Sequence, residues 1–490
     1  MAAAVGPSAA GTNGAVSAAH PLAVEAGVGV LRAGGTAADA AIAAQAVLCV
    51  VAPEACGIGG DALALVAEPT GTVTAVNGTG CWALAANVNA QCSDGGASVT
   101  VPGLSGAWAE LSSRYGRLPL SECVAAAIAL ADDGIQMPAA TASAAVEQRR
   151  RLLAGGAREW VMATSAPGAT VRQPELAEAL RGIACHGDAW LRLEPISTAI
   201  VAAAQRNGGA LRVDDLFAHE TPVAEPISTE FAEGRLYVQP PMTQGVLLAM
   251  AAHWLNHAKL SLDPLFLDHL GVELSEAVFQ HRDHIADGAA LLAHSLDVDP
   301  VRAARRGGPR AYLHTAGVAA VDADGMVLSS LVSVFDDFGS CVYVPELGIT
   351  LNNRAGGFTT GANRPRPAHR PVHTLAPALW SGPSERVGLA TPGADGQIQT
   401  LIQVLCRWRL LGDTLESAIT APRWRSEDNA LLIEDNHPHF AALADQGHAL
   451  ERRPAGAGVF GAVVAAGIDH RDGTTRAWSD WRRDVAAGVA

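Results

Sequence analysis

Two mainly apolar segments joined by a tight turn constrain the fold of this chain more than any other feature. Residues 315–321 and 326–335 are separated only by Asp322-Ala323-Asp324-Gly325. We therefore expect a β-hairpin with Thr315 at its open end. A threonine at the start of a strand is ordinarily just a β-branched residue suited to a sheet. Whether Thr315 has a chemical role depends on the rest of the chain.

The composition indicates a large, compact protein that does not bind nucleic acid. The 490 residues are 49% hydrophobic and 17% charged, which predicts two or three folding units or one large α/β body. A formal net charge of -15 repels phosphate backbones, so we expect no nucleic-acid partner. The eight cysteines are scattered without a CxxC pair or metal-ligand spacing, which predicts reduced thiols.

No segment has the character of a signal peptide or a membrane span. Residues 1–19 have neither a basic start nor an apolar core. The longest apolar run, residues 40–52, is too short to cross a bilayer and contains Gln45. We therefore expect a cytoplasmic protein without membrane contact.

Glycines and capping residues indicate where several elements begin and end. Residues 21–32 predict a helix, and a capping box at residues 36–39 opens a second helix that stops before Pro53. A glycine turn at residues 57–60 leads into a strand, without the spacing of a dinucleotide-binding loop. A later strand enters a second glycine turn, residues 392–396, which a helix follows. Residues 299–313 lack apolar periodicity and predict an exposed linker.

The histidine pairs of this chain do not predict a metal site. His281 and His284 have i,i+3 spacing, yet no third ligand is evident. His437 and His439 flank a proline and are typical of a turn. We expect neither a metal nor another cofactor.

Several short motifs occur in the order typical of one enzyme family. They are Ser17-Ala18-Ala19-His20-Pro21-Leu22-Ala23, Gly34-Gly35-Thr36-Ala37-Ala38-Asp39, Gly57-Ile58-Gly59-Gly60-Asp61, Val101-Pro102-Gly103, Val171-Arg172-Gln173-Pro174, Gln239-Pro240-Pro241, Leu351-Asn352-Asn353, Arg370-Pro371 and Thr391-Pro392-Gly393. Any one of them is weak, but together they make the chain resemble the γ-glutamyltranspeptidase family of N-terminal nucleophile hydrolases. The resemblance covers about residues 15–480.

The resemblance implies an α+β fold, a four-layer αββα sandwich, and a precursor that cleaves itself. The cut would fall between His314 and Thr315. It would give a large subunit of residues 1–314 and a small subunit of residues 315–490, which together form one body. A dimer of such heterodimers is the higher assembly that the resemblance leaves open.

The same resemblance gives chemical roles to four residues. Thr315 would be the nucleophile, and its freed α-amino group, with a reference pKa of about 7.7 to 8.0, would be the base. The backbone N–H groups of Gly393 and Ala394 would hold the oxyanion, where the family has two consecutive glycines. Ser333 matches a hydroxyl that supports the amino group.

The residues that grip a γ-glutamyl head group in this family are replaced here. Thr79 stands in place of an arginine, His373-Thr374 in place of two serines, and Phe335 in place of an asparagine. Gly356-Gly357 replaces a pair of aspartates. Burying a zwitterion without charged partners is costly, so we do not expect a γ-glutamyl substrate.

The replacements are similar to the oxamate amidohydrolase branch of the family. The similarity lies in Asn353-Arg354, in His373-Thr374-Leu375 and in residues 391–400, although Cys81 stands where that branch has an arginine. Arg354 is the candidate to pair with a substrate carboxylate, with a structural arginine as the alternative. His373 either contacts substrate or is structural. The expected substrate-binding set is Arg354, His373, Thr374, Phe335, Cys81 and Trp82, with core packing as the alternative for Trp82.

The sequence thus predicts a self-processing threonine amidohydrolase. Its substrate would be a small, oxamate-like amide or acyl-amide, and its partner the other subunit of the same precursor. One alternative is an acyltransferase that passes the acyl group to an amine in a biosynthetic pathway. The other is an inactive family member that acts as a binding protein.

Overall fold

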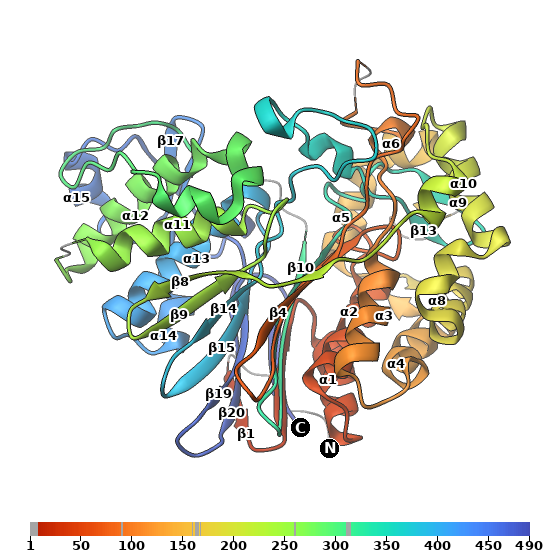
Figure 1. Ribbon diagram of the computed structural model, residues 1–490, viewed down its shortest axis with the longest axis horizontal. Coiled ribbons are helices and arrows are strands. Elements are labelled where there is room, and N and C mark those ends of the chain that lie inside the picture. Colours follow the sequence, from red (N-terminus) through yellow and green to blue (C-terminus); the bar gives the residue numbers. More distant parts are fainter. Residues whose placement is uncertain are drawn as a thin grey trace.

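Two β-sheets packed face to face form the centre of the molecule, and helices cover their outer faces (Figure 1). The computed structural model describes residues 8–89, 92–158, 160–161, 166, 168–258, 261–309 and 315–490. Each central sheet has seven strands in the described residues. The predicted αββα sandwich is therefore confirmed.

The first central sheet, called the β10 sheet, contains the hairpin. Its strands, in order across the sheet, are β21 (Ala486–Val489), β2 (Gly14–Ala18), β10 (Ala316–Asp322), β11 (Val327–Ser333), β3 (Asp61–Ala67), β4 (Val73–Gly78) and β7 (Val223–Ala224). The second is called the β15 sheet. Its strands, in order, are β1 (Ser8–Gly11), β20 (Thr475–Ser479), β19 (Val464–Asp469), β15 (Glu385–Ala390), β14 (Ala378–Ser381), β9 (Gly234–Val238) and β8 (Ile227–Phe231).

Strands β10 and β11 confirm the predicted hairpin. Val321 pairs with Val327 beside the turn, and Ala316 pairs with Val332 toward the open end. The Asp322 carboxylate accepts the N–H groups of Asp324 and Met326 and so fixes the turn. Every residue of both strands is buried, because the β15 sheet covers one face and helices cover the other. Strands covered on both faces need apolar or small residues at successive positions, as this sequence has.

Helices form the two outer layers (Figure 1). On the side of the β10 sheet lie α1 (Pro21–Arg32), α2 (Ala37–Val51), α3 (Leu104–Tyr115), α4 (Leu120–Asp133), α8 (Pro174–His186) and α9 (Glu194–Arg206). On the side of the β15 sheet lie α11 (Gly245–His257), α12 (Pro264–Phe279), α13 (Gln397–Leu405) and α14 (Leu415–Thr420). The predicted capping box is present, because Thr36 and Asp39 each accept the other's backbone N–H.

Three hydrophobic clusters separate the four layers. Val47 of α2 and Val318 of β10 belong to the cluster between helices and the β10 sheet. The neighbouring residue, Ala319, belongs to the cluster between the two sheets. Leu389 of β15 and Leu401 of α13 belong to the cluster between the β15 sheet and its helices. Successive strand residues thus fill different layers, as the alternation of side chains along a strand requires.

Shorter elements surround the sandwich. The minor strands are β5 (Ile135–Gln136), β6 (Thr170–Val171), β12 (Tyr343–Val344), β13 (Ile349–Thr350), β16 (Trp424–Glu427), β17 (Ala430–Glu434) and β18 (Leu450–Arg453). The short helices are α5 (Ala139–Glu147), α6 (Arg149–Ala154), α10 (Val213–Phe217) and α15 (Phe440–Asp445). Helical turns include η3 (Arg282–Ala293), η4 (Arg354–Gly357), η5 (Gly361–Asn363) and η6 (Ala394–Gly396).

The segments before and after Thr315 are interleaved. Strands β2 and β3 come from residues 1–314 and flank the hairpin, which comes from residues 315–490. The expectation of an exposed linker before Thr315 is confirmed for residues 299–302, 304 and 305, which are exposed and belong to no helix or strand, whereas residues 306–308 are half-buried and Pro309 is buried. Arg306 lies 2.7 Å from the carboxylate of the buried Glu273, and Gly308 pairs with Asp428. Residues 310–313 and His314 lie outside the described residues.

Two further expectations concern cysteines and membranes. All eight cysteines are free, and most are buried or half-buried. Among the described residues, no helix has the length and apolar character that crossing a bilayer requires.

Candidate active site

Thr315 lies at the start of β10, in a row of polar residues that crosses the β10 sheet. Its hydroxyl Oγ1 donates to Ser333 Oγ at 3.3 Å, and Ser333 pairs with Asp61 of β3. These side chains face the β15 sheet. A Cβ on Gly317, two residues beyond Thr315, would meet Val464 and Ala390 of that sheet. Strand register therefore brings together a threonine, a serine and an aspartate that are far apart in the sequence.

The predicted oxyanion turn connects β15 to α13. Gly393 and Ala394 both have positive φ, +128° and +48°, and Ala394 begins η6, which runs directly into α13. The backbone N–H groups at such a helix start suit a developing negative charge. Gln244 at the start of α11 fixes this turn, because its Nε2 donates to the carbonyls of Ala394 and Thr374.

A fully buried charge cluster occupies the row next to Ser333. Arg354 Nε donates to Asp61 Oδ2 at 2.9 Å, and His373 Nε2 lies 3.1 Å from the same oxygen. The Arg354 guanidinium lies 4.5 Å from the centre of the Phe335 ring. The Phe335 N–H donates to Ser333 Oγ, so the cluster is also joined to the hydroxyl beside Thr315. The sequence had placed Arg354, His373 and Phe335 in one predicted substrate-binding set, and in the structure these three side chains form one cluster with Asp61.

Burial and Arg354 decide the charges in this cluster. Burial first, and the Arg354 charge second, lower the pKa of His373 to about 4, against the opposing effect of Asp61. Burial alone raises the pKa of Asp61, but Arg354 and His373 more than offset it and hold that pKa below its usual value. At neutral pH the cluster is therefore an ionised Asp61 with a charged Arg354 and a neutral His373.

The guanidinium of Arg354 has hydrogen-bond donors that the described residues do not use. Among the described residues, its Nη1 and Nη2 have no hydrogen-bond partner, and neither does Asp61 Oδ1. A buried guanidinium with two unpartnered nitrogens matches the two oxygens of a carboxylate.

Sequence reasoning missed two residues that organise the site. Asp61 appeared only as the end of a glycine motif, yet it joins Arg354 to His373. Its signal was an acidic residue at the head of an otherwise apolar strand. Gln244 was missed altogether, and its signal was a buried amide at the start of an apolar helix.

A cavity of about 290 Å³, called the flanking cavity, lies directly against Thr315. Both Thr315 and Pro392, which precedes Gly393, line it. The nucleophile candidate and the oxyanion turn therefore border one space. Arg354 and His373 are not among the described residues that line it.

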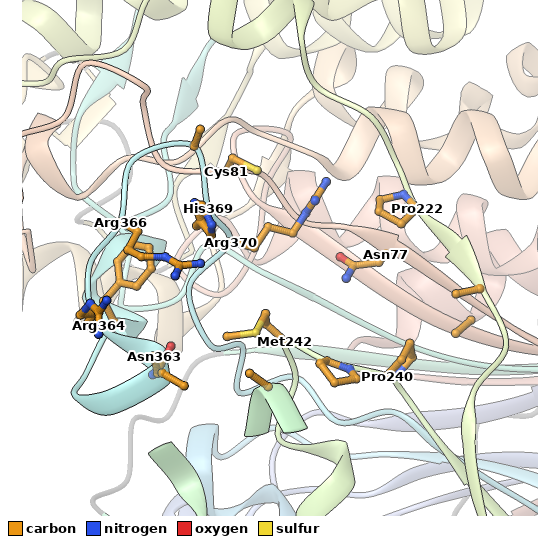
Figure 2. Close-up of a pocket in the computed structure, with 17 residues that line it drawn as sticks. Asn77, Cys81, Pro222, Pro240, Met242, Asn363, Arg364, Arg366, His369 and Arg370 are labelled. Carbon is orange, nitrogen blue, oxygen red and sulfur yellow. The ribbon is translucent and has the colours of Figure 1, made fainter. Parts of the chain in front are cut away.

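A second cavity of about 420 Å³, called the outer cavity, opens beyond β4 (Figure 2). Cys81, Met242 and Arg370 surround this space in Figure 2, and Arg364 and Arg366 also line it. No carboxylate is among its described lining residues. Arg370 is held in place by two carbonyls, because its Nε donates to Thr79 and its Nη2 to Glu220.

Two of the predicted substrate contacts are placed away from Thr315. Cys81 lines the outer cavity. Trp82 is buried, its Nε1 donates to the Ala97 carbonyl at 2.9 Å, and its ring packs 5.5 Å from Phe358. Trp82 thus supports the loop that covers the outer cavity.

In the part of the chain that the structure describes, one group of three side chains of metal-ligand type occurs outside the site. Asp268, His437 and His439 place their ligand atoms within 4.8 Å of one another. His439 Nδ1 bonds to the Asp268 carboxylate at 2.6 Å, and His437 Nδ1 accepts the His439 N–H. The second bond leaves the proton of a neutral His437 on Nε2, the atom that would bind a metal. These hydrogen bonds account for the cluster without an ion.

Comparison with known proteins agrees with this architecture. A solved structure of cephalosporin acylase from Bacillus halodurans superposes with a TM-score of 0.87 at 25% identity, over 99% of this chain and 97% of that one. The oxamate amidohydrolase proenzyme of Klebsiella pneumoniae is 30% identical over 90% of this chain and 92% of its own length. A glutathione hydrolase-like proenzyme of Bacillus subtilis is 29% identical over 97% of this chain and 98% of its own.

The fold and these relatives define the class of the protein as an amidohydrolase of the N-terminal nucleophile type. The family model described as Gamma-glutamyltranspeptidase matches residues 23–299 and 293–490. The chain belongs to the γ-glutamyltranspeptidase family, and the predicted family and branch are confirmed. The protein is therefore an enzyme, and the alternative of an inactive binding protein falls away.

Proposed function

We propose that this protein is a self-processing amidohydrolase whose nucleophile is Thr315. The observation that carries the proposal is the position of its hydroxyl, which is hydrogen-bonded to Ser333 and borders the same cavity as the oxyanion turn. Cleavage between His314 and Thr315 would yield two subunits, and the interleaved strands would hold them in one body. Association of two such heterodimers remains a prediction.

The residues around Thr315 suit acyl transfer through a covalent intermediate. After processing, the neutral α-amino group of Thr315 takes the hydroxyl proton while Oγ1 attacks the amide carbon. The N–H groups of Gly393 and Ala394 hold the oxyanion. The C–N bond then breaks, and the amine leaves with the proton. Water, activated by the same amino group, attacks the ester on Thr315 and releases the acid.

The proposed substrate is a small amide whose acyl half carries a carboxylate. The Klebsiella relative is named for oxamate, an amide of this kind. Two features of this chain support the same class: the unpartnered nitrogens of Arg354, and the basic outer cavity in a protein of net charge -15. Arg354 would pair with the carboxylate, while Phe335, His373 and Thr374 would shape the surrounding wall.

A second candidate function is acyl transfer to an amine rather than to water. The flanking cavity favours it, because a space beside the nucleophile can admit an acceptor. Adding amines to the reaction and analysing the products for a new amide separates the two functions.

Processing and turnover test the proposal together. Wild-type protein should run on a denaturing gel as fragments of residues 1–314 and 315–490, and Thr315→Ala should stay intact and lose at least about 10³-fold in amide turnover. Thr315→Ser keeps a hydroxyl and should still be cleaved. Oxamate should be hydrolysed faster than a γ-glutamyl anilide. Cleavage of the Thr315→Ala protein at residue 314 would exclude Thr315 as the nucleophile.

A further inference from the structure

A pair of histidines lies near the end of α11, in the outer helical layer on the side of the β15 sheet (Figure 1). His253 and His257 stand four positions apart, about one helical turn, and the centres of their rings are 4.3 Å apart. Both line a cavity of about 430 Å³, called the histidine cavity, to which His294 also contributes. Two histidines with this spacing on a helix share one face and can bind one metal ion together.

Hydrogen bonds fix which nitrogen of each ring carries the proton. His257 Nδ1 lies 2.8 Å from the His253 carbonyl, and a carbonyl only accepts, so this Nδ1 is the donor. His253 Nδ1 lies 3.1 Å from the Thr229 hydroxyl oxygen, whose own proton is donated to the Glu230 carbonyl, so this Nδ1 is a donor as well. A neutral ring that carries its proton on Nδ1 keeps a lone pair on Nε2, and metal-bound histidines usually have such a second partner.

Both Nε2 atoms are accessible to an ion. Among the described residues, neither atom has a hydrogen-bond partner. Burial first, and His257 second, lower the pKa of His253, which keeps this ring neutral at pH 7. The arrangement is the reverse of that at His437, where the bond to Nδ1 leaves the proton on Nε2.

The rest of the histidine cavity suits a bound cation. No lysine, arginine, aspartate or glutamate is among its described lining residues, and much of the wall is apolar, from Met250, Trp254, Leu292 and Leu296. An apolar shell limits the access of solvent to a metal ion, and a net charge of -15 attracts cations to the molecule. The structure does not gather His294 with His253 and His257 into a three-ligand group, so the pair supplies two ligands and water the others.

We propose that His253 and His257 bind one transition-metal dication of the kind that prefers imidazole nitrogen, such as Ni²⁺, Cu²⁺ or Zn²⁺. Bonds of about 2.0 to 2.1 Å, as for zinc, place two ligand nitrogens about 3 to 4 Å apart, which the spacing of the two rings allows. No metal was expected from the sequence, where the spacing alone does not show which nitrogen carries the proton.

The proposed ion would be structural rather than catalytic. Helix α11 has 13 residues and ends at His257, and at about 1.5 Å per residue its two ends are roughly 20 Å apart. Gln244, which holds the oxyanion turn, stands at the other end. The ion would therefore hold the last turn of α11 without reaching Thr315.

Calorimetric titration with Ni²⁺ at neutral pH tests the proposal. The tightest Ni²⁺ site of the wild-type protein should weaken at least tenfold in His253→Gln and in His257→Gln. His284 supplies the control, because it is exposed and does not line the histidine cavity. His284→Gln should keep the wild-type affinity within about twofold. Equal Ni²⁺ affinity in wild type, His253→Gln and His257→Gln would overturn the inference.

Two further variants test whether geometry, rather than the number of histidines, creates the site. His257→Gln combined with Ala258→His keeps the number of histidines but moves one ring off the shared face, so it should bind as weakly as His257→Gln. Thr229→Val keeps the shape of the side chain and removes the oxygen that accepts the His253 Nδ1–H. Loss of such a partner costs 10- to 100-fold in metal affinity, so a loss of about tenfold is expected. Wild-type affinity in either variant would overturn the inference.

The unprocessed Thr315→Ala protein separates this inference from the proposed function. It lacks the freed amino group, which is a competing metal ligand, but it keeps α11 and should bind Ni²⁺ as wild type does. Ni²⁺ should also raise its melting temperature more than that of Thr315→Ala combined with His253→Gln. Ni²⁺ binding that is lost in Thr315→Ala would overturn the inference. If Ni²⁺ binds as expected but no amide is hydrolysed, only the proposed function fails.

Discussion

At the scale of single residues, Ser333 is the side chain that holds the Thr315 hydroxyl. Its Oγ accepts from Thr315 and from the Phe335 N–H. Ser333→Ala removes one hydrogen bond to the nucleophile and leaves the Phe335 N–H without this acceptor. A hydrogen bond is worth about 0.5 to 1.5 kcal/mol, so processing and turnover should each slow by roughly 2- to 13-fold. Gel densitometry of the precursor over time and steady-state kinetics measure the two rates.

Ser329 supplies the control for this prediction. It lies on the same strand and the same face as Ser333, is equally buried, and donates to the Leu389 carbonyl at 2.7 Å without touching Thr315. Ser329→Ala should lower the free energy of unfolding by about 1 kcal/mol and leave processing unchanged. Equal rates of processing in the two variants would exclude a specific role for Ser333.

Substitutions of Ala394 test whether a backbone N–H group, rather than a side chain, stabilises the oxyanion. Its φ of +48° costs an alanine about 1 kcal/mol relative to glycine. Ala394→Gly keeps the N–H, so activity should remain within about twofold and the melting temperature should not fall. Ala394→Pro removes the N–H and should reduce kcat by about 10² to 10³-fold. Comparable activity of the glycine and proline variants would contradict the role given to this donor.

Some residues of the candidate site could be predicted from the sequence, and others could not. Arg354 and His373 were recognisable as replacements within known motifs, but their shared partner Asp61 was not. The pairing of Arg354 with Asp61 spans 293 positions in the chain. It depends on the packing of residues 352–353, whose N–H groups donate to the carbonyls of Gly59 and Val334, and no local pattern encodes these contacts. The same holds for Cys81, whose place in the outer cavity depends on the loop that covers it.

At the scale of elements, the start of α11 holds two catalytic-site loops together. Gln244 Nε2 donates to the Thr374 carbonyl of one loop and the Ala394 carbonyl of the other. Gln244→Ala should cost about 1 to 3 kcal/mol of stability and also lower kcat, because the oxyanion turn loses its anchor. Gln399→Ala is the control, since this buried glutamine bonds only to Ser426 and Gln403 among the described residues. It should lower stability by a similar amount and keep kcat. A Gln244→Ala enzyme with unchanged kcat would contradict the prediction.

Elements with local signals were predicted well, and elements fixed by distant contacts were not. The first helix has the predicted bounds, Pro21–Arg32, because its proline start and glycine end lie in the sequence itself. The linker before Thr315 is exposed as predicted over most of its described residues, but Arg306 is half-buried because Glu273 of α12 holds it, in an ion pair that apolar periodicity does not reveal.

At the scale of the whole molecule, the site exists only because two sheets and their connections converge. The flanking cavity takes its walls from the segments that follow β2 and α2, from the start of α5, from Thr315 and Ala316, from Pro392, and from the segments before β19 and β21. The sequence predicted the sandwich through ordered motifs, since these mark strand ends and turns. It did not predict the cavity, because the volume of a cavity depends on how seven separate segments pack.

Buried histidines predict how the stability of the whole molecule depends on pH. Burial first, and nearby positive charge second, lower the pKa of His219 and of His373 to about 4, from the ordinary histidine value of about 6.5. The folded state therefore keeps both rings neutral, while the unfolded state binds protons below pH 6.5. Their contribution to stability is complete above pH 6.5 and is lost as the pH falls toward 4. As the pH falls from 6.5 to 5, each of the two histidines should lower the free energy of unfolding by about 1.5 kcal/mol.

Replacing one of these histidines isolates its share of the pH dependence. His219 lies apart from Thr315, and among the described residues its Nε2 has no hydrogen-bond partner, so His219→Gln removes a titrating ring without removing a bond from that atom. Urea titrations at pH 6.5 and pH 5 should show that the variant loses about 1.5 kcal/mol less than wild type over this interval. The exposed His257 serves as control, because His257→Gln should leave the difference between the two pH values unchanged. An identical loss in the His219 and His257 variants would mean that His219 is protonated in the folded state at pH 5, and its burial would then not govern acid stability.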